Sequence, residues 1–529
     1  MRMAAAGGRL IPFEPPRAVQ SFFAPRLSRA LVYASPDAYA RFALACVLFP
    51  LVPEAVLGLL LPTPLALLLA VPCVLTQLFP LAYLSARSSQ RKRAVEAELP
   101  FIAMLIYVLS HETVPSLSLA FEKISGLGQE LFPAFGAESQ ALVRNLTYGT
   151  GAEADTVEST FSDHPSSQFR EFVHGYLTTL ASGRDVHEFV KLESERLMGM
   201  LEERWRSFSG MVSSTTEIAF IFLAVFPIGL QMIAGALLSG SASVVLLLSI
   251  LFLTFVTGAI LLWLDYAQPS IRDGRYPVRG VAAVTGSLGL CVALYLLRLI
   301  GPAEAAVFGL AASSGFVVLS HGFFGRLRSG EGEAVTMLHD LAEEARSGVS
   351  VPVALSHLRE NASRYPSLGD PISTFVSLLS LGQPPRLAQR RVRHPSWLVR
   401  VSFGLLATSF ETGSGFEQLE RLSASFRRIR DARRLIQSSV LPFAVLGASV
   451  PVISLASFWF LSSMQGFSLL VPGLSFASGS LSIGVSVIAT SILTGFIVSK
   501  AYSFSFRSLV GVPPILLTAL ISLLFFGLA

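Results

Sequence analysis

The sequence is poor in charged residues and in cysteine. Asp, Glu, Lys and Arg make up 14% of its 529 residues, whereas roughly 25% is usual for soluble domains. Hydrophobic residues account for 52%. The three cysteines, Cys46, Cys73 and Cys291, all lie in apolar runs, so no disulfide framework is expected. This balance indicates a membrane protein with several spans.

Motifs of common catalytic and metal sites are also missing from the sequence. It contains no Gly-x4-Gly-Lys-Ser/Thr phosphate loop. His111-Glu112 begins like a zinc-protease motif, but Pro115 stands where the second histidine is needed. His164, His174 and His187 have no cysteine or spaced carboxylate to complete a metal site, so we interpret them as a scatter on helix surfaces. We expect no enzyme, no cofactor, no metal and no nucleic acid partner.

Long apolar runs predict nine transmembrane helices. Each run is near the ~20 residues that cross a bilayer, and ionisable residues are nearly absent from their middles, which argues against a proton-coupled pump. The runs are Phe42–Leu61, Leu65–Leu84, Ile218–Leu238, Val244–Leu264, Val281–Leu299, Ala305–Ser320, Val440–Leu461, Leu481–Lys500 and Ser508–Leu528.

These runs divide the chain into six regions. They are a leader (1–41), spans one and two (42–84), a first soluble block (85–217), spans three to six (218–320), a second soluble block (321–439) and spans seven to nine (440–529). Strand-like alternation is absent from both blocks, so each is expected to be a helical bundle. The predicted helices are Leu99–Leu109, Ser116–Ile124, Ser139–Tyr148, Ser167–Ala181 and Val186–Phe208 in block one. In block two they are Glu333–Ser347, Val353–Arg359, Pro371–Leu381, Ser396–Glu411 and Phe416–Gln437.

The distribution of Lys and Arg predicts the orientation. With the N-terminus in the cytoplasm, both blocks and the hinges Arg272–Arg279 and Lys500–Arg507 lie inside, whereas the connections Ser239–Ser243 and Met464–Ser480 carry no charge. Positive charge concentrates on the cytoplasmic side of membrane proteins. We therefore expect a multi-pass protein of the plasma membrane, with both blocks cytoplasmic and the C-terminus outside.

The two blocks share residues in one register, which indicates an internal repeat. His164-Pro165-Ser166 matches His394-Pro395-Ser396 at an offset of 230 residues. The same offset relates Arg170 to Arg400, Thr178 to Thr408, Gly183 to Gly413 and Arg204 to Arg434. Several matches in one register, each followed by a long apolar run, favour duplication over chance. Four spans per copy would make the repeats parallel.

A basic amphipathic helix ends the second block. Its apolar residues recur at the three-or-four spacing of a helix: Phe416, Leu419, Leu422, Phe426, Ile429 and Ile436. Block two has a net charge of +5 and block one of −6. From charge alone, the basic face could meet anionic lipid or an acidic protein. The candidate partner-binding residues are Arg421, Arg427, Arg428, Arg430, Arg433 and Arg434.

Both blocks resemble the F domain of type II secretion systems. The resemblance rests on Glu98-Leu99-Pro100, on LHDLAEEARSGVSVPVALSHL (Leu338–Leu358) and on ETGSGFEQLERLSASF (Glu411–Phe426). Block one departs from the family pattern at His111-Glu112-Thr113, where a Ser-Gly or similar turn is usual. Two blocks with nine spans look like the long archaeal form of the family.

The resemblance implies a membrane platform of an archaeal type IV pilus-like machine, serving either an archaellum or an adhesion pilus. Such a platform binds a hexameric secretion ATPase and helps lift pilin or archaellin subunits from the membrane into a filament. The expected partners are this ATPase, these subunits and membrane lipids, with a homodimer left open. The alternative is a transporter with cytoplasmic helical domains, which would require broken helices with polar midpoints; no clear pair of these is found.

Overall fold

In the residues described by the structure, a computed structural model, the chain is helical and contains no strand. This confirms the all-α expectation. The described ranges are 16–32, 34–60, 63–110, 116–127, 130–148, 151–226, 242–269, 301–413, 416–463, 480–505 and 507–526, with residues 229, 273, 282, 285–290 and 294 between them. The chain forms two compact units. Unit 1 comprises residues 1–198, 384–390 and 404–414, and unit 2 comprises the remainder.

Five helical stretches in the described part of the chain are long and apolar enough to cross a membrane: Val186–Val225, Ser249–Ala267, Pro302–Arg346, Gln418–Ser457 and Ser486–Ser503. They are compatible with a membrane-embedded protein. The ninth predicted span corresponds to the 14-residue helix α20 (Val512–Phe525), which is shorter than the ~20 residues of a full crossing. Most of Val281–Leu299 lies outside the described residues.

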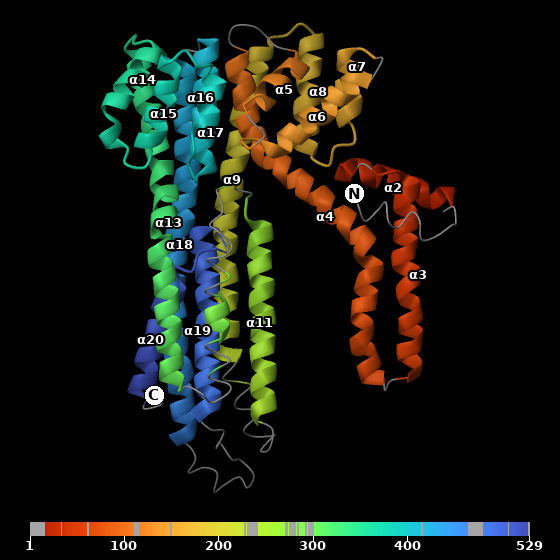
Figure 1. Cartoon of the computed structure of the whole chain (residues 1–529), viewed down its shortest axis with the longest axis vertical. Helices are drawn as coiled ribbons and strands as arrows, with labels where there is room; N and C mark the ends of the chain where they lie inside the picture. Colours follow the sequence, from red (N-terminus) through yellow and green to blue (C-terminus); the bar gives the residue numbers. More distant parts are fainter. Residues whose placement is uncertain are drawn as a thin grey trace. The chain divides into compact units, whose positions relative to one another are not determined.

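Unit 1 begins with a short helix and a helical hairpin. Helix α2 (Arg17–Ala30) lies across the N-terminal end of α3 (Pro36–Leu60) and beside the middle of α4 (Thr63–Leu109) in Figure 1. A small apolar core joins the three helices, formed by Phe23, Leu27, Ala30, Tyr39, Ala40, Ala43 and Leu84. The sequence predicted a leader over residues 1–41 and assigned no helix to it, so α2 is an addition to that prediction.

Block one continues from the hairpin without a break, because α4 carries both apolar residues and the start of the block. Its other helices are α5 (Leu117–Ser125), α6 (Pro133–Tyr148), α7 (Glu153–Phe161), α8 (Ser167–Ala181) and α9 (Val186–Phe220). The bounds of α8 match the prediction. Helix α7 was not predicted, because its nine residues provide only two turns of periodic pattern.

Block two has its helices in the same order. They are α13 (Pro302–Arg346), α14 (Val351–Glu360), α15 (Gly369–Ser380), α16 (Pro385–Arg391), α17 (Trp397–Thr412) and α18 (Phe416–Ser463). The seven-residue α16 was not predicted. As in α4, single helices carry both block and apolar sequence, since α13 and α18 each exceed forty residues.

Several helix boundaries of the two blocks are separated by 230 residues. Helices α8 and α17 begin at Ser167 and Trp397, and α9 and α18 begin at Val186 and Phe416. Gly183 and Gly413, which precede α9 and α18, have φ angles of 64° and 59°. Glycine adopts this left-handed conformation without the steric cost that a Cβ imposes. The two glycines therefore occupy the same kind of turn, as the register predicted.

In unit 2, α11 (Ala242–Ala267) runs beside α19 (Ser480–Ser503), and α13, α18 and α20 complete this helical group (Figure 1). Helices α19 and α20 approach closely at two glycines. A Cβ on Gly495 would lie 2.7 Å from the Cα of Val512, and one on Gly511 would lie 2.8 Å from the carbonyl oxygen of Gly495. Small residues permit such close crossings between membrane helices.

Candidate functional site

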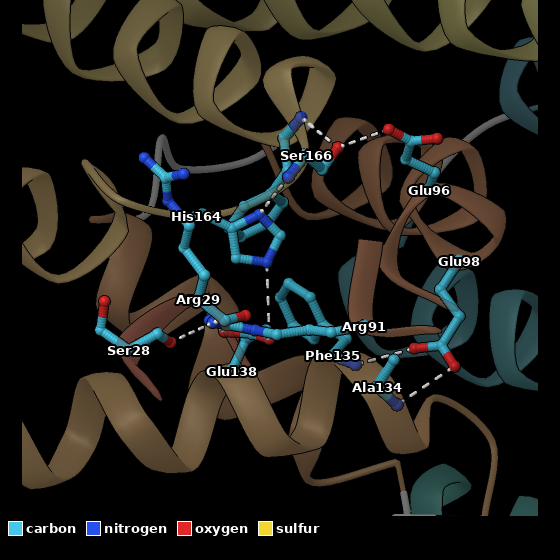
Figure 2. Close-up of polar contacts among 11 residues, drawn as sticks. Ser28, Arg29, Arg91, Glu96, Glu98, Ala134, Phe135, Glu138, His164 and Ser166 are labelled. Carbon is cyan, nitrogen blue, oxygen red and sulfur yellow. Dashed lines mark hydrogen bonds and ion pairs between the residues drawn. The ribbon is translucent and has the colours of Figure 1, made fainter. Parts of the chain in front are cut away.

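The interior of block one contains a cluster of polar side chains that joins its helices (Figure 2). Glu98, on α4, is fully buried. Its two carboxylate oxygens accept hydrogen bonds from the backbone N–H groups of Ala134 (3.2 Å) and Phe135 (2.8 Å). These donors belong to the first turn of α6 and have no partner within their own helix. The negative charge also suits the positive end of the helix dipole, so Glu98 fixes the start of α6 against α4.

The carboxylate of Glu96, also on α4, fixes the start of α8. The Ser166 hydroxyl donates to Oε1 of Glu96 at 2.9 Å and accepts from the Phe169 N–H at 3.3 Å, which makes Ser166 the N-cap of α8. The Ser166 N–H donates in turn to Nδ1 of His164 at 3.1 Å. His164 is buried, so the prediction that it belongs to a surface scatter is wrong.

Arg91 connects this cluster to α2, as Figure 2 shows. Its guanidinium donates to both carboxylate oxygens of Glu138, at 2.7 and 2.6 Å, and to the carbonyl oxygens of Ser28 (2.8 Å) and Arg29 (3.0 Å). Nε2 of His164 lies 3.5 Å from the same Glu138 carboxylate. Burial by itself raises the pKa of Glu138, but Arg91 and His164 together hold it below its usual value. Glu138 is therefore a buried anion paired with the Arg91 guanidinium.

Block two contains the corresponding contacts. Glu333 accepts from the N–H groups of Ser367 (2.8 Å) and Leu368 (3.0 Å), immediately before α15. The Ser396 hydroxyl donates to Glu331 at 3.3 Å, and the Ser396 N–H donates to Nδ1 of His394 at 3.1 Å. In each block, two glutamates spaced by one residue hold the starts of two later helices.

The buried charge in block two has a different partner. Glu331 forms an ion pair with Arg433 of α18, and the Arg433 guanidinium lies 5.1 Å from the centroid of the Trp205 ring. Asp273 accepts from the N–H of Trp397 at 2.8 Å. Burial raises the pKa of Asp273 to about 6, an effect that Glu331 adds to and Arg433 opposes.

His394 is the buried histidine of this second cluster. Its ring lies against Gly330, where a Cβ would approach Nε2 to 2.6 Å. Burial lowers the pKa of His394 to about 4, and the charges of Arg400 and Arg326 act in the same direction. The ring is therefore neutral near pH 7, with Nδ1 as an acceptor.

The sequence contained a signal for these glutamates that the 230-residue register did not use. Arg-x-Arg-x-x-Glu-x-Glu occurs at residues 91–98 and again at residues 326–333. Its offset is 235 residues, because the segment between the glutamates and the histidine is five residues shorter in block two. Among the residues described, no group of His, Cys, Asp and Glu is arranged to hold a metal ion. The contacts above are those of groups that hold helices together.

No family model, curated protein or solved structure matches this chain. The functional argument therefore depends on its own residues and contacts.

The structure divides the six predicted partner-binding arginines into two groups. The apolar positions Leu419, Leu422, Phe426, Ile429 and Ile436 are all buried, as predicted, whereas the side chain of Phe416 lies outside the described residues. Arg427, Arg428 and Arg434 are exposed; Arg430 is partly exposed and pairs with Asp431 at 3.1 Å. Arg421 is half-buried.

Arg433 does not lie on the basic surface. It is 6% exposed and paired with Glu331. The physical reason is its position, four residues after Ile429 and three before Ile436, which places it on the buried stripe of the helix. The exposed basic face therefore consists of Arg427, Arg428, Arg430 and Arg434.

Proposed function

We propose that this chain is the integral membrane platform of an archaeal type IV pilus-like machine, an archaellum or an adhesion pilus. It would couple a cytoplasmic secretion ATPase to the extraction and assembly of pilin-like subunits. The exposed basic face of α18, consisting of Arg427, Arg428, Arg430 and Arg434, would meet the ATPase. Arg433 is excluded from this surface because of its burial.

One observation supports this proposal more than any other, namely the continuity of α18. The helix runs without interruption from Phe416 to Ser463, with Pro442 and Pro451 in its apolar part, so that its basic turns and its apolar, membrane-compatible part belong to one continuous element. Each proline removes one backbone hydrogen bond, but the basic turns lie before both of them. A force applied by a motor at the basic face would therefore reach the membrane helices directly.

The proposal includes the predicted duplication and the nine spans. The matching helix order, the two left-handed glycines and the repeated glutamate–serine–histidine contacts support a duplication. Moreover, Ser209 and Ser439, which are 230 residues apart, meet with their hydroxyl oxygens at 3.4 Å. Contact between equivalent residues is expected near an axis that relates two copies.

The transporter alternative gains no support from the irregular apolar segment that follows α9. The π-helical segment η1 (Ile221–Val225) interrupts the regular helix after α9. Such segments often occur at functional sites. However, its five residues are all apolar, whereas a substrate or ion site within a membrane requires polar groups.

The test of the docking face is a charge reversal with a matched control. Arg427, Arg428 and Arg430 are changed together to Glu; the control changes three exposed arginines elsewhere in block two, Arg346, Arg359 and Arg364. Exposed charge pairs contribute about 0.2–1 kcal/mol each, so the loss of three should weaken binding of the purified ATPase roughly three- to 140-fold. The measurement is made in neutral detergent at low ionic strength, where screening is least, together with filament counts in cells.

The control should bind as the parent protein does. If the first variant binds normally but fails only in anionic bilayers, the face is a lipid anchor and the ATPase docks elsewhere. Equal loss in both triple variants would show that only the net charge of block two matters, and would also contradict the proposal.

The nine-span topology is tested by single cysteines in a background without native cysteine. Cysteines at Ser241 and Gly473, both outside the described residues, should react with an impermeant thiol reagent from outside the cell. Cysteines at Ser182 and Ser363, which are exposed in their blocks, should react only after lysis. External labelling of either block would overturn the orientation.

A further inference from the structure

Helix α2 has two contrasting faces. Phe23, Leu27 and Ala30 are buried against α3 and α4. The opposite face carries three exposed arginines, Arg17, Arg26 and Arg29. The sequence of α2, RAVQSFFAPRLSRA, contains no acidic residue. The nearest acidic residue that follows in the chain, Asp37, is paired with Arg41. Asp37 also accepts a hydrogen bond from the Gln20 side chain of α2 at 3.4 Å. The exposed side of α2 therefore carries three arginines and no acidic residue of its own.

Helix α2 contacts α4 at Leu84, where the exposed apolar part of α4 ends. Before this point, α4 exposes Leu78, Phe79, Leu81 and Tyr83, each by 43–54%. Leu84 is buried beneath α2, and the next exposed side chains with charge are Arg87 and Lys92. Apolar side chains on the outside of a predicted span face lipid tails, whereas basic residues follow at the headgroups. Helix α2 thus lies at the level of the headgroups.

An aromatic ring on the outer face of α2 fits the same environment. Phe22 is 43% exposed, and the Arg26 guanidinium carbon lies 3.5 Å above its ring centroid. The same guanidinium donates to the carbonyl oxygen of Phe22 at 2.6 Å. Helices in the plane of a membrane interface carry Lys and Arg on one face and Phe, Trp or Leu on the other. In α2 the apolar face packs against α3 and α4, and Phe22 is a large apolar side chain that stays exposed beside the arginines.

We propose that α2 is an interfacial helix that binds the headgroups of anionic lipids through Arg17, Arg26 and Arg29. The three exposed arginines, with no acidic residue on α2 itself, and the level of α2 at the end of the apolar zone identify a lipid surface as its partner. This inference rests on the predicted span in α4, which is part of the proposed function, but it concerns neither the ATPase nor the filament subunits.

The contacts of Arg91 give this binding a consequence for block one. The carbonyl oxygens at the C-terminal end of α2, those of Ser28 and Arg29, accept from Arg91, which also pairs with Glu138 of α6. The lipid-bound helix is thus fastened to the polar cluster inside block one. Helix α2 would hold that block at a defined height and orientation at the membrane surface.

The experiment uses the full chain in lipid nanodiscs. Cys46, Cys73 and Cys291 are replaced by Ser, and a cysteine at Ser21, which is exposed on α2, carries a fluorophore. A nitroxide on the lipid headgroups quenches this fluorophore when α2 lies among them. Discs of neutral phosphatidylcholine are compared with discs in which about one-third of the lipid is phosphatidylglycerol, at low and high salt.

We expect stronger quenching in the anionic discs and loss of the difference at high salt, because screening weakens the attraction. Each arginine near an anionic surface favours binding about fivefold, so Arg17, Arg26 and Arg29 together contribute on the order of a hundredfold. Changing all three to Gln should abolish the lipid dependence. A control with Arg144, Arg170 and Arg184 changed to Gln, all exposed in block one, should retain it.

Equal quenching in neutral and anionic discs would overturn the proposal. So would quenching that disappears equally in the two triple variants, or a lipid-dependent signal that survives in the α2 variant. If the fluorophore responds only when another protein is added, α2 is a protein-docking helix and the lipid assignment is wrong. Because the substituted side chains are exposed, the variants should elute from size-exclusion chromatography as the parent does.

Discussion

Replacing Arg433 with Gln should destabilise the protein far more than the same change at Arg434. Arg433 is 6% exposed and its partner Glu331 is 7% exposed. Without the guanidinium, the Glu331 carboxylate remains buried without its countercharge. Breaking a buried pair from one side costs about 3–5 kcal/mol, because the remaining charge is neither hydrated nor neutralised. Loss of the Arg433–Trp205 stacking adds about 0.5–1 kcal/mol.

Arg434 is the matched control, since it is the next residue on the same helix but is exposed. Surface substitutions of this kind usually change stability by less than about 0.5 kcal/mol. The two variants therefore remove the same charge from the same basic stretch and should differ by about 3 kcal/mol or more. The assay is unfolding of the detergent-solubilised protein, followed by tryptophan fluorescence and by the loss of soluble monomer.

A double variant shows whether the ion pair itself is responsible. Changing both Glu331 and Arg433 to Gln leaves no buried charge from the pair, so most of the lost stability should return. Under the proposed function, the double variant should also keep the parent's ATPase binding, because Arg433 is buried and lies away from the exposed basic face. Equal stability of the two single variants would refute the buried pair. A double variant less stable than Arg433→Gln would refute the electrostatic explanation.

Three further outcomes follow from the contacts. Cysteines at Ser209 and Ser439, whose hydroxyl oxygens are 3.4 Å apart, should form a disulfide under mild oxidation. Cysteines at Ser209 and the neighbouring exposed Ser438 should form little disulfide. Equal disulfide yields from the two pairs would contradict the 230-residue register. The pKa of His394 in the folded protein is lowered to about 4. Between the ordinary pKa of about 6.5 and about pH 4, the histidine is therefore protonated in the unfolded state but not in the folded state. The free energy of unfolding should fall by a few kcal/mol as the pH falls through this window. A His394→Gln variant should lose that part of the pH dependence, and an unchanged unfolding profile would argue against a buried neutral ring. Changing Gly495 to Val should disrupt the α19–α20 crossing and lower the unfolding temperature, and a neutral effect would show that these helices can separate.

Local patterns were sufficient to predict the class of fold and much of the helical framework. The buried stripe of α18, from Leu419 to Ile436, was predicted because three-or-four spacing depends only on helix geometry. The bounds of α8 were predicted because Ser166 before them and Gly183 after them are local cap and turn signals. The short helices α7 and α16 and the leader helix α2 lacked a repeating pattern of sufficient length.

The sequence by itself thus determined an all-helical, membrane-compatible chain, since composition and periodicity are properties of neighbouring residues. Only the tertiary structure decided which charges are buried and which are available to a partner. Arg433 and Arg434 are adjacent and chemically identical, yet one is paired with Glu331, 102 residues away in sequence, and the other is exposed. Glu98 and Arg91 show the same dependence, because their partners on α6 and α2 lie far along the chain. A charge is stable in the interior only where folding supplies its partner, and hydrophobic periodicity carries no information about that partner.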